Sequence, residues 1–161
     1  MAQTVGDLSG LPTRENPGLS AILQSKWYQD IDGRMTVNCE RELSQHDFSK
    51  IDVHTLPGSL ELPLAATDIL AGDTNGEIDA VICFGVIVKG ETLHFEMITN
   101  ECMRGLSDAM LKYRRPVIVE VLPVFKIEDA ETRAANDEFN KGYEAAAAAI
   151  EMIAWRRSVG A

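Results

Sequence analysis

The chain has 161 residues, with 25 acidic against 15 basic side chains and a formal net charge of −10 at pH 7. This length suits one domain and is enough to bury an apolar core without disulfides or a metal. The acidic balance disfavours a general nucleic-acid surface. No run is long enough to span a membrane, and the first thirty residues lack the layout of a secretion signal. We therefore expect a soluble, cytoplasmic protein with neither nucleic-acid nor membrane partners.

The chain contains three cysteines, Cys39, Cys83 and Cys102, an odd number without a paired CxxC spacing. This pattern is typical of a reducing compartment and disfavours structural zinc, so no metal site is predicted. Their apolar or helical surroundings predict small buried residues rather than nucleophiles.

Residues 1–18 contain Gly, Pro and Thr without apolar periodicity. We expect a flexible N-terminal arm, mobile or lying over a neighbour, followed by a single domain over residues 19–161. The predicted strands span 19–24, 51–56, 79–88 and 116–122, and the predicted helices span 30–45, 62–70, 93–114, 127–133 and 140–157. The run 79–88 is typical of a central strand covered on both faces. The alternation predicts an α/β fold with an open, mainly parallel, four-stranded sheet in three layers.

Ligands of open parallel sheets bind beyond the carboxyl ends of the strands. The segment that follows the most apolar strand contains Lys89, Gly90, Glu91 and Thr92. Glycine lets backbone amides approach a ligand, and a helix start, with Thr92 as its expected N-cap, favours an anion. This turn is a candidate phosphate cradle, although a solvated turn is the ordinary alternative.

His94 begins the following helix, where an imidazole suits proton transfer, although a lone histidine is more often structural. Trp27 follows the first strand and either stacks on a planar heterocycle or covers the core. Glu61 begins a helix and either binds a polyol or offsets the helix dipole. Arg133 either clamps a phosphate or pairs with a neighbouring glutamate, Glu128 or Glu131.

Four further side chains have ordinary explanations. Met97 and Met103 stand at helical spacing and are predicted to lie in the core. His46 and His54 are assigned structural or solvated positions.

Three strings, PGSLELP, DAVICFGVIVKGETLHFEMI and RAANDEFNKGYEAAAAAIEM, occur in the order and at the spacing found in the 6,7-dimethyl-8-ribityllumazine synthase family. The resemblance covers about residues 19–153. It implies a flavodoxin-like α/β/α sandwich and the penultimate step of riboflavin synthesis. It also implies active sites shared between neighbouring subunits of a pentamer. The substrates would be 5-amino-6-(D-ribitylamino)uracil and 3,4-dihydroxy-2-butanone 4-phosphate, and no cofactor is expected.

The resemblance assigns roles to particular residues. His94 matches the catalytic histidine, and Trp27 the aromatic residue that stacks on the pyrimidine. The ribityl-binding loop is matched by Ser59, Leu60 and Glu61, and the strand end that binds the uracil edge by Val86, Ile87 and Val88. The phosphate-binding turn is matched by Gly90, Glu91 and Thr92, and the basic residues that bind the phosphate by Lys89 and Arg133. Val119 stands where a residue arrives from the neighbouring subunit.

Four departures from the family pattern bear on ligand affinity and assembly. Tyr28 stands where asparagine commonly follows the aromatic, and Val119 where an aromatic or aliphatic residue arrives from the neighbouring subunit. Glu120 stands where glycine is usual, and residues 137–139 replace a stretch with lysine and glycine. The homo-oligomer is therefore expected as a pentamer or an assembly of pentamers, with a 60-subunit shell among the alternatives. Riboflavin synthase is a candidate partner.

Other functions stay open beside the enzyme. The chain is also consistent with a weakly catalytic homologue that binds riboflavin or a lumazine, or with a shell-forming scaffold. A flavodoxin-type electron carrier is the alternative at the level of the fold.

Overall fold

The computed structural model describes residue 10 and residues 18–161. Residues 1–9 and 11–17, which make up almost all of the predicted arm, lie outside the described residues. The elements are β1 (Gly18–Ser25), α1 (Gln29–Gln45), β2 (Phe48–Leu56), the 3-10 turn η1 (Ser59–Glu61), α2 (Leu62–Gly72), β3 (Ala80–Val88), α3 (His94–Tyr113), β4 (Val117–Val124), α4 (Ile127–Arg133) and α5 (Lys141–Ser158). Every strand and helix expected from the sequence is confirmed, with shifted ends.

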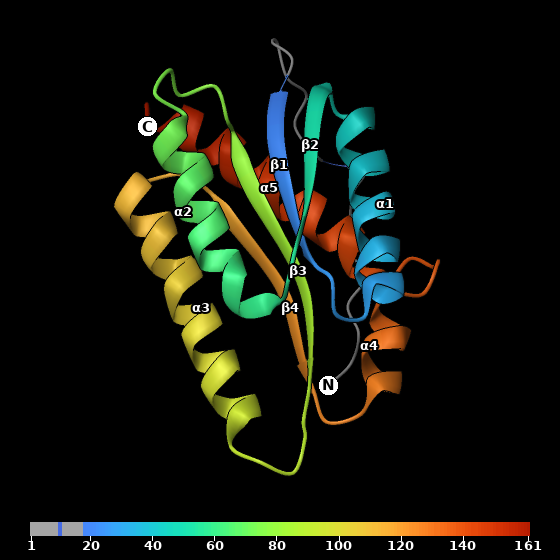
Figure 1. Cartoon of the computed structure of the whole chain (residues 1–161). Coiled ribbons are helices and arrows are strands. Elements are labelled where there is room, and N and C mark those ends of the chain that lie inside the picture. The colour runs from blue at the N-terminus through green and yellow to red at the C-terminus, as the bar shows by residue number, and fades with distance from the viewer. Residues whose placement is uncertain (1–9, 11–17) are drawn as a thin grey trace.

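The four strands form one parallel sheet in the order β2-β1-β3-β4. Helices α2 and α3 cover one face, and α1, α4 and α5 cover the other (Figure 1). This is the three-layer, flavodoxin-like arrangement. Because all strands run the same way, their carboxyl ends meet at one edge of the sheet, where the turn from β3 to α3 also lies.

Strand β3 connects the two layers of the core. Residues Ala80 to Ile87 of β3 are buried, and its side chains alternate between the two apolar clusters. The central position predicted for this strand is confirmed. All three cysteines are buried, as expected, and burial raises the pKa of the Cys83 thiol.

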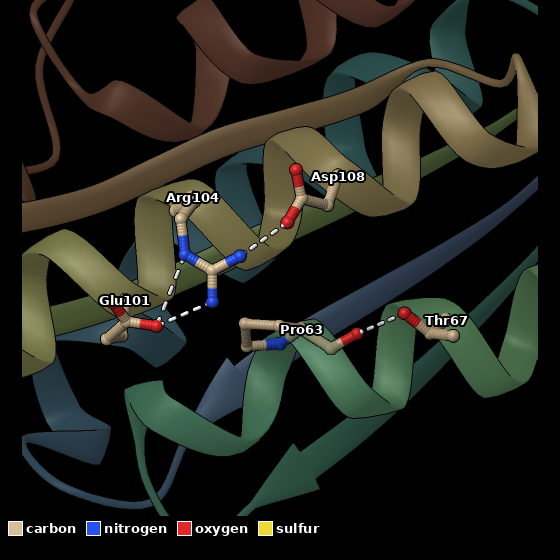
Figure 2. Close-up of polar contacts among 5 residues, drawn as sticks. All are labelled: Pro63, Thr67, Glu101, Arg104 and Asp108. Carbon is tan, nitrogen blue, oxygen red and sulfur yellow. Dashed lines mark hydrogen bonds and ion pairs between the residues drawn. The ribbon is translucent and has the colours of Figure 1, made fainter.

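Helices α2 and α3 approach closely at Gly105. A Cβ atom on this glycine would lie 2.7 Å from Cβ of Pro63, so a larger residue would force the helices apart. Figure 2 shows Pro63 below the α3 ribbon, with Thr67 donating a hydrogen bond to the Pro63 carbonyl at 2.7 Å. This contact fixes the direction of α3, which begins at His94.

Two sequence predictions for the helix α3 are corrected. The core position predicted for Met97 is wrong, because this residue lies on the outward face of α3 and is 65% exposed. Met103 packs against the core, as expected. Thr92 is not the N-cap, since the helix begins at His94 with Leu93 before it. Within the described part of the chain, no helix has the length and apolar character needed to cross a membrane.

Asp32 is a buried carboxyl group in the first turn of α1. Neither of its oxygens has a hydrogen-bond partner among the described residues. Burial raises the pKa of Asp32 to about 8, although the backbone of Ser25 opposes the shift. The group is therefore neutral in the folded protein at neutral pH.

This carboxyl group predicts a loss of stability as the pH rises. The folded-state pKa lies above the unfolded value of about 4, so between these values the folded state binds more protons than the unfolded state. The free energy of unfolding therefore falls from about pH 4 to about pH 8. We expect Asp32→Asn to remove this dependence and to be more stable than the wild type by up to about 5 kcal/mol above pH 8, because the pKa rises from about 4 in the unfolded chain to about 8 in the folded protein.

Urea denaturation between pH 5 and pH 9 measures this effect. Asp30→Asn is the matched control, because Asp30 lies in the same turn but is exposed. Parallel pH profiles of the wild type and Asp32→Asn would contradict the assignment.

Candidate active site

A hollow of about 420 Å³ lies at the carboxyl end of the sheet, between the β1–α1 turn, η1, the end of β3 and the start of α3. It is lined by Trp27, Gly58, Ser59, Leu60, Glu61, Val86, Ile87, His94 and Ile98. Its volume is within the range of about 300–1,000 Å³ typical of small-molecule sites. Seven of the residues proposed from the sequence therefore meet in one place.

The turn η1 is held between β3 and α3. A Cβ atom on Gly85 would lie 2.6 Å from the Ser59 hydroxyl and 3.4 Å from Ser59 Cβ, so only glycine leaves room for this serine. From the other side, the Cys102 thiol donates a hydrogen bond to the Ser59 carbonyl at 3.1 Å. Burial, with a contribution from Glu61, raises the pKa of Cys102 to about 11, so the thiol keeps its proton and remains a donor.

Trp27 lies close to the same turn. A Cβ atom on Gly58 would lie 3.4 Å from Cδ1 of Trp27 and 3.0 Å from Oε2 of Glu61. The Trp27 amide donates a hydrogen bond to the Ser25 hydroxyl at 3.1 Å, which fixes the residue just after β1. The side chain is 69% exposed, so its ring is available for stacking.

His94 is the first residue of α3, and its side chain is exposed at the hollow. Ile98 follows one helical turn later on the same face and also lines the hollow. The backbone amide of His94 lies 3.4 Å from the Thr92 hydroxyl, a long contact that ties the turn to the helix without capping it.

Lys89 is already engaged by neighbours. Its ammonium lies 2.6 Å from Oε1 of Glu96 and 5.5 Å from the ring centroids of both Phe95 and Phe125. The hydrogen bond from Lys89 lowers the pKa of Glu96. A phosphate that binds Lys89 therefore has to share this cation with Glu96.

The remaining predicted residues do not line this hollow. The residues Lys89 to Thr92 follow β3 beside it, whereas the Val88 side chain packs in the layer of α1 and α5. Val119 packs against the layer of α2 and α3. Arg133 lies at the end of α4, and its guanidinium donates to the Asp129 carbonyl at 2.7 Å. Neither glutamate suggested from the sequence forms an ion pair with it among the described residues.

Comparison with known proteins assigns the family. The family model described as 6,7-dimethyl-8-ribityllumazine synthase matches residues 19–157. The chain belongs to this family. Proteins with that name from Stenotrophomonas maltophilia (strain K279a) and Campylobacter concisus (strain 13826) are 36% and 33% identical to it. The first alignment covers 83% of this chain and 85% of the relative, and the second covers 87% and 89%. A relative from Xanthomonas euvesicatoria pv. vesicatoria (strain 85-10) is 34% identical over 83% of this chain and 86% of its own length.

One departure from the lumazine synthase pattern places a carboxyl group inside the sandwich. Glu120 of β4 lies among charges on α5, where Lys141 forms an ion pair with Glu144. Burial raises the pKa of Glu120 to about 7; Lys141 opposes the shift and Glu144 adds to it. This carboxyl group therefore changes charge near neutral pH in a layer next to the site.

Three residues in or beside the hollow were given no individual role from the sequence. For Ile98, the only sequence feature that indicates a place at the hollow is its spacing of four residues from His94, which puts both on one face of the helix. Cys102 was interpreted as a small buried residue, and nothing in the sequence places its thiol against Ser59. Phe125 is 73% exposed and faces Lys89 only because β4 continues to Val124, beyond the predicted end of the strand.

The close approach of Gly85 and Ser59 predicts a paired effect on stability. Gly85→Ala places a methyl group against the Ser59 hydroxyl and should lower the free energy of unfolding by about 1–3 kcal/mol. In the double variant Gly85→Ala with Ser59→Ala, the hydroxyl is gone and the remaining contact, at 3.4 Å, is an ordinary one. Urea denaturation should therefore show that the double variant recovers most of the loss. An equal loss in both variants would contradict this contact.

Proposed function

We propose that this chain condenses 5-amino-6-(D-ribitylamino)uracil with 3,4-dihydroxy-2-butanone 4-phosphate to give 6,7-dimethyl-8-ribityllumazine. Membership of the family supports this reaction. The observation that carries it is the meeting of Trp27, the turn 59–61 and His94 in one hollow of about 420 Å³. These groups supply a stacking surface, polar partners for a polyol and a proton carrier.

In our proposal the uracil ring stacks on Trp27 and its edge bonds to the end of β3. Val86 and Ile87 both line the hollow, although their side chains pack against opposite clusters. We propose that the main chain at the end of β3 borders the hollow, as recognition of a uracil edge requires, and that Val88 continues this edge. The ribityl chain would lie along Ser59, Leu60 and Glu61, where a hydroxyl and a carboxylate are available.

The phosphate would bind beside the hollow at Gly90, Glu91 and Thr92. The side chains of this turn are exposed, and the helix α3 starts immediately after it. Backbone amides and a helix start favour an anion. Lys89 would contribute charge that it shares with Glu96. Arg133 would complete the binding of the phosphate from another subunit.

The proposed reaction begins when the 5-amino group attacks the ketone carbonyl. Water leaves as the imine forms, phosphate is then eliminated, and attack by the ribitylamino nitrogen with loss of a second water closes the ring. His94 would carry protons between these steps, a contribution typically of about 10²–10⁴-fold. Holding both substrates side by side would supply much of the remaining acceleration.

We also propose that the active site is shared between subunits of a pentamer or an assembly of pentamers. Val119 and Arg133 support this, because in one chain neither lines the hollow that holds His94. A cytoplasmic location and transfer of the product to riboflavin synthase belong to the same proposal.

The alternative function, binding of riboflavin or a lumazine with little catalysis, is not favoured by the match to the family. The chain departs from the family pattern at Tyr28, Val119 and Glu120, and Tyr28 adopts a left-handed backbone with φ 59° beside the stacking residue. Quenching of tryptophan fluorescence by riboflavin, with lumazine formation measured on the same sample, separates the two functions. Tight binding without turnover would favour the second.

The proton-carrier role predicts different kinetic effects for two variants. His94→Ala should lower kcat by about 10²-fold or more with a small change in KM. Arg133→Ala should mainly raise KM for the phosphate substrate, because this substrate can saturate the weakened site. Lumazine formation followed by fluorescence measures both. A His94→Ala variant with full kcat would exclude this role.

The shared site predicts recovery of activity on mixing subunits. His94→Ala and Arg133→Ala chains, unfolded and refolded together, should form some sites that take His94 from one chain and Arg133 from another. With random assembly this is about one quarter of the sites. With the phosphate substrate well below the KM of the Arg133→Ala variant, the co-refolded sample should therefore exceed the summed activity of the two variants refolded separately. Simple addition would place both residues in a site within one chain.

A further inference from the structure

Four arginines gather at the end of the molecule that is farthest from the hollow. Arg114 and Arg115 follow α3, and Arg156 and Arg157 lie in the last turn of α5. Figure 1 shows the end of α5 near the start of β3, opposite the turn that joins β3 to α3. Four of the 15 basic side chains of a chain with net charge −10 are therefore concentrated in one place.

A groove of about 250 Å³ lies beside these arginines, and three of them, Arg114, Arg115 and Arg156, form its rim. It is lined by Met110, Leu111, Arg114, Arg115, Pro116, Met152 and Arg156. Its floor is apolar, and no acidic side chain from the described part of the chain lines it. Leu111, which lines it, is 73% exposed, and Trp155, which precedes Arg156 in α5, is 58% exposed. The groove thus combines an apolar floor with a cationic rim.

The arginines of the rim are not neutralised within the described part of the chain. Arg157 lies 3.3 Å from Asp79, but no described Asp or Glu forms an ion pair with Arg114, Arg115 or Arg156. Arg115 is nevertheless half-buried, and a Cβ atom on Gly76 would lie 2.6 Å from its guanidinium. Its guanidinium therefore lies against the loop before β3.

Arg104 provides the contrast on the same helix. Its guanidinium lies 2.6 Å from carboxylate oxygens of both Glu101 and Asp108, as Figure 2 shows. Arg104 is thus paired because carboxylates lie beside it on α3, whereas Arg114 and Arg115, which follow the helix, line a groove to which no described residue contributes a carboxylate. Arg, Trp and Met are also the residues enriched at protein–protein contacts.

We propose that this groove binds an acidic peptide segment of a partner protein, with one apolar side chain seated on the floor between Leu111 and Met152. Carboxylates on either side of that anchor would pair with Arg114 and Arg156. The groove is smaller than the roughly 300–1,000 Å³ of typical small-molecule sites, which favours a single side-chain anchor over a whole ligand. Its distance from the hollow leaves catalysis independent of the partner.

The test uses the full chain and two fluorescein-labelled peptides of about eleven residues. In one, a central leucine is flanked on both sides by glutamates; in the other, serine replaces the leucine. Anisotropy should show binding of the leucine peptide that weakens as salt rises, and weaker binding of the serine peptide. The double variant Arg114→Asn with Arg156→Gln should lose about tenfold or more in affinity. Asn is chosen because Arg114 has a left-handed backbone with φ 51°.

Arg104→Gln is the matched control, because it removes an exposed arginine of α3 outside the groove. It should bind the leucine peptide as the wild type does, and all variants should keep lumazine formation. The proposal would be overturned if the wild type did not bind the leucine peptide, or bound the serine peptide equally well. Equal losses of affinity in Arg104→Gln and in the double variant would also overturn it. So would a changed sedimentation coefficient of the double variant together with no binding of the peptide by the wild type. The last would assign the groove to a second copy of this chain.

Discussion

The burial of β3 on both faces is the constraint on which the rest of the structure depends. The strand pairs with β1 and β4 along its length and supplies side chains to both apolar clusters. Burying its main chain is favourable only because the parallel neighbours satisfy its amides and carbonyls. Its carboxyl end, at residues 86–88, is thereby fixed at the edge of the sheet. The hollow forms there because the turns after β1, β2 and β3 must also emerge at that edge.

A second constraint acts where the turn η1 (Ser59–Glu61) meets the sheet. Gly85 interrupts the apolar side chains of β3 and lets Ser59 approach the main chain of the strand. Cys102 then holds the Ser59 carbonyl from α3. The turn Ser59–Glu61 is thus joined to two layers of the sandwich at once. Such support is needed because a three-residue 3-10 turn has little stability of its own.

The order of the elements was predictable because apolar runs, helical periodicity and Pro or Gly breaks agree along the chain. The parallel sheet followed from the alternation of strands and helices. Most of the hollow followed from the resemblance, because motif residues at strand ends converge wherever the sheet is parallel. Contacts made by packing between distant segments were not predictable. Neither the thiol bond to Ser59 nor the pairing of Lys89 with Glu96 and two phenylalanines leaves a local signal.

Net charge describes this molecule poorly, because its charges are separated by position. A charge of −10 suggests repulsion of anions, yet Lys89 stands at the proposed phosphate turn and four arginines stand at the opposite end. A binding site responds to the groups within a few ångströms, since exposed charges beyond about 8–10 Å are largely screened at physiological salt. The two cationic regions differ in whether carboxylates pair with their side chains. Lys89 is paired with Glu96, which lowers the cost of leaving it without a ligand. Of the four arginines, Arg157 is paired with Asp79, whereas Arg114, Arg115 and Arg156 form no ion pair among the described residues and retain their full charge for an incoming acid.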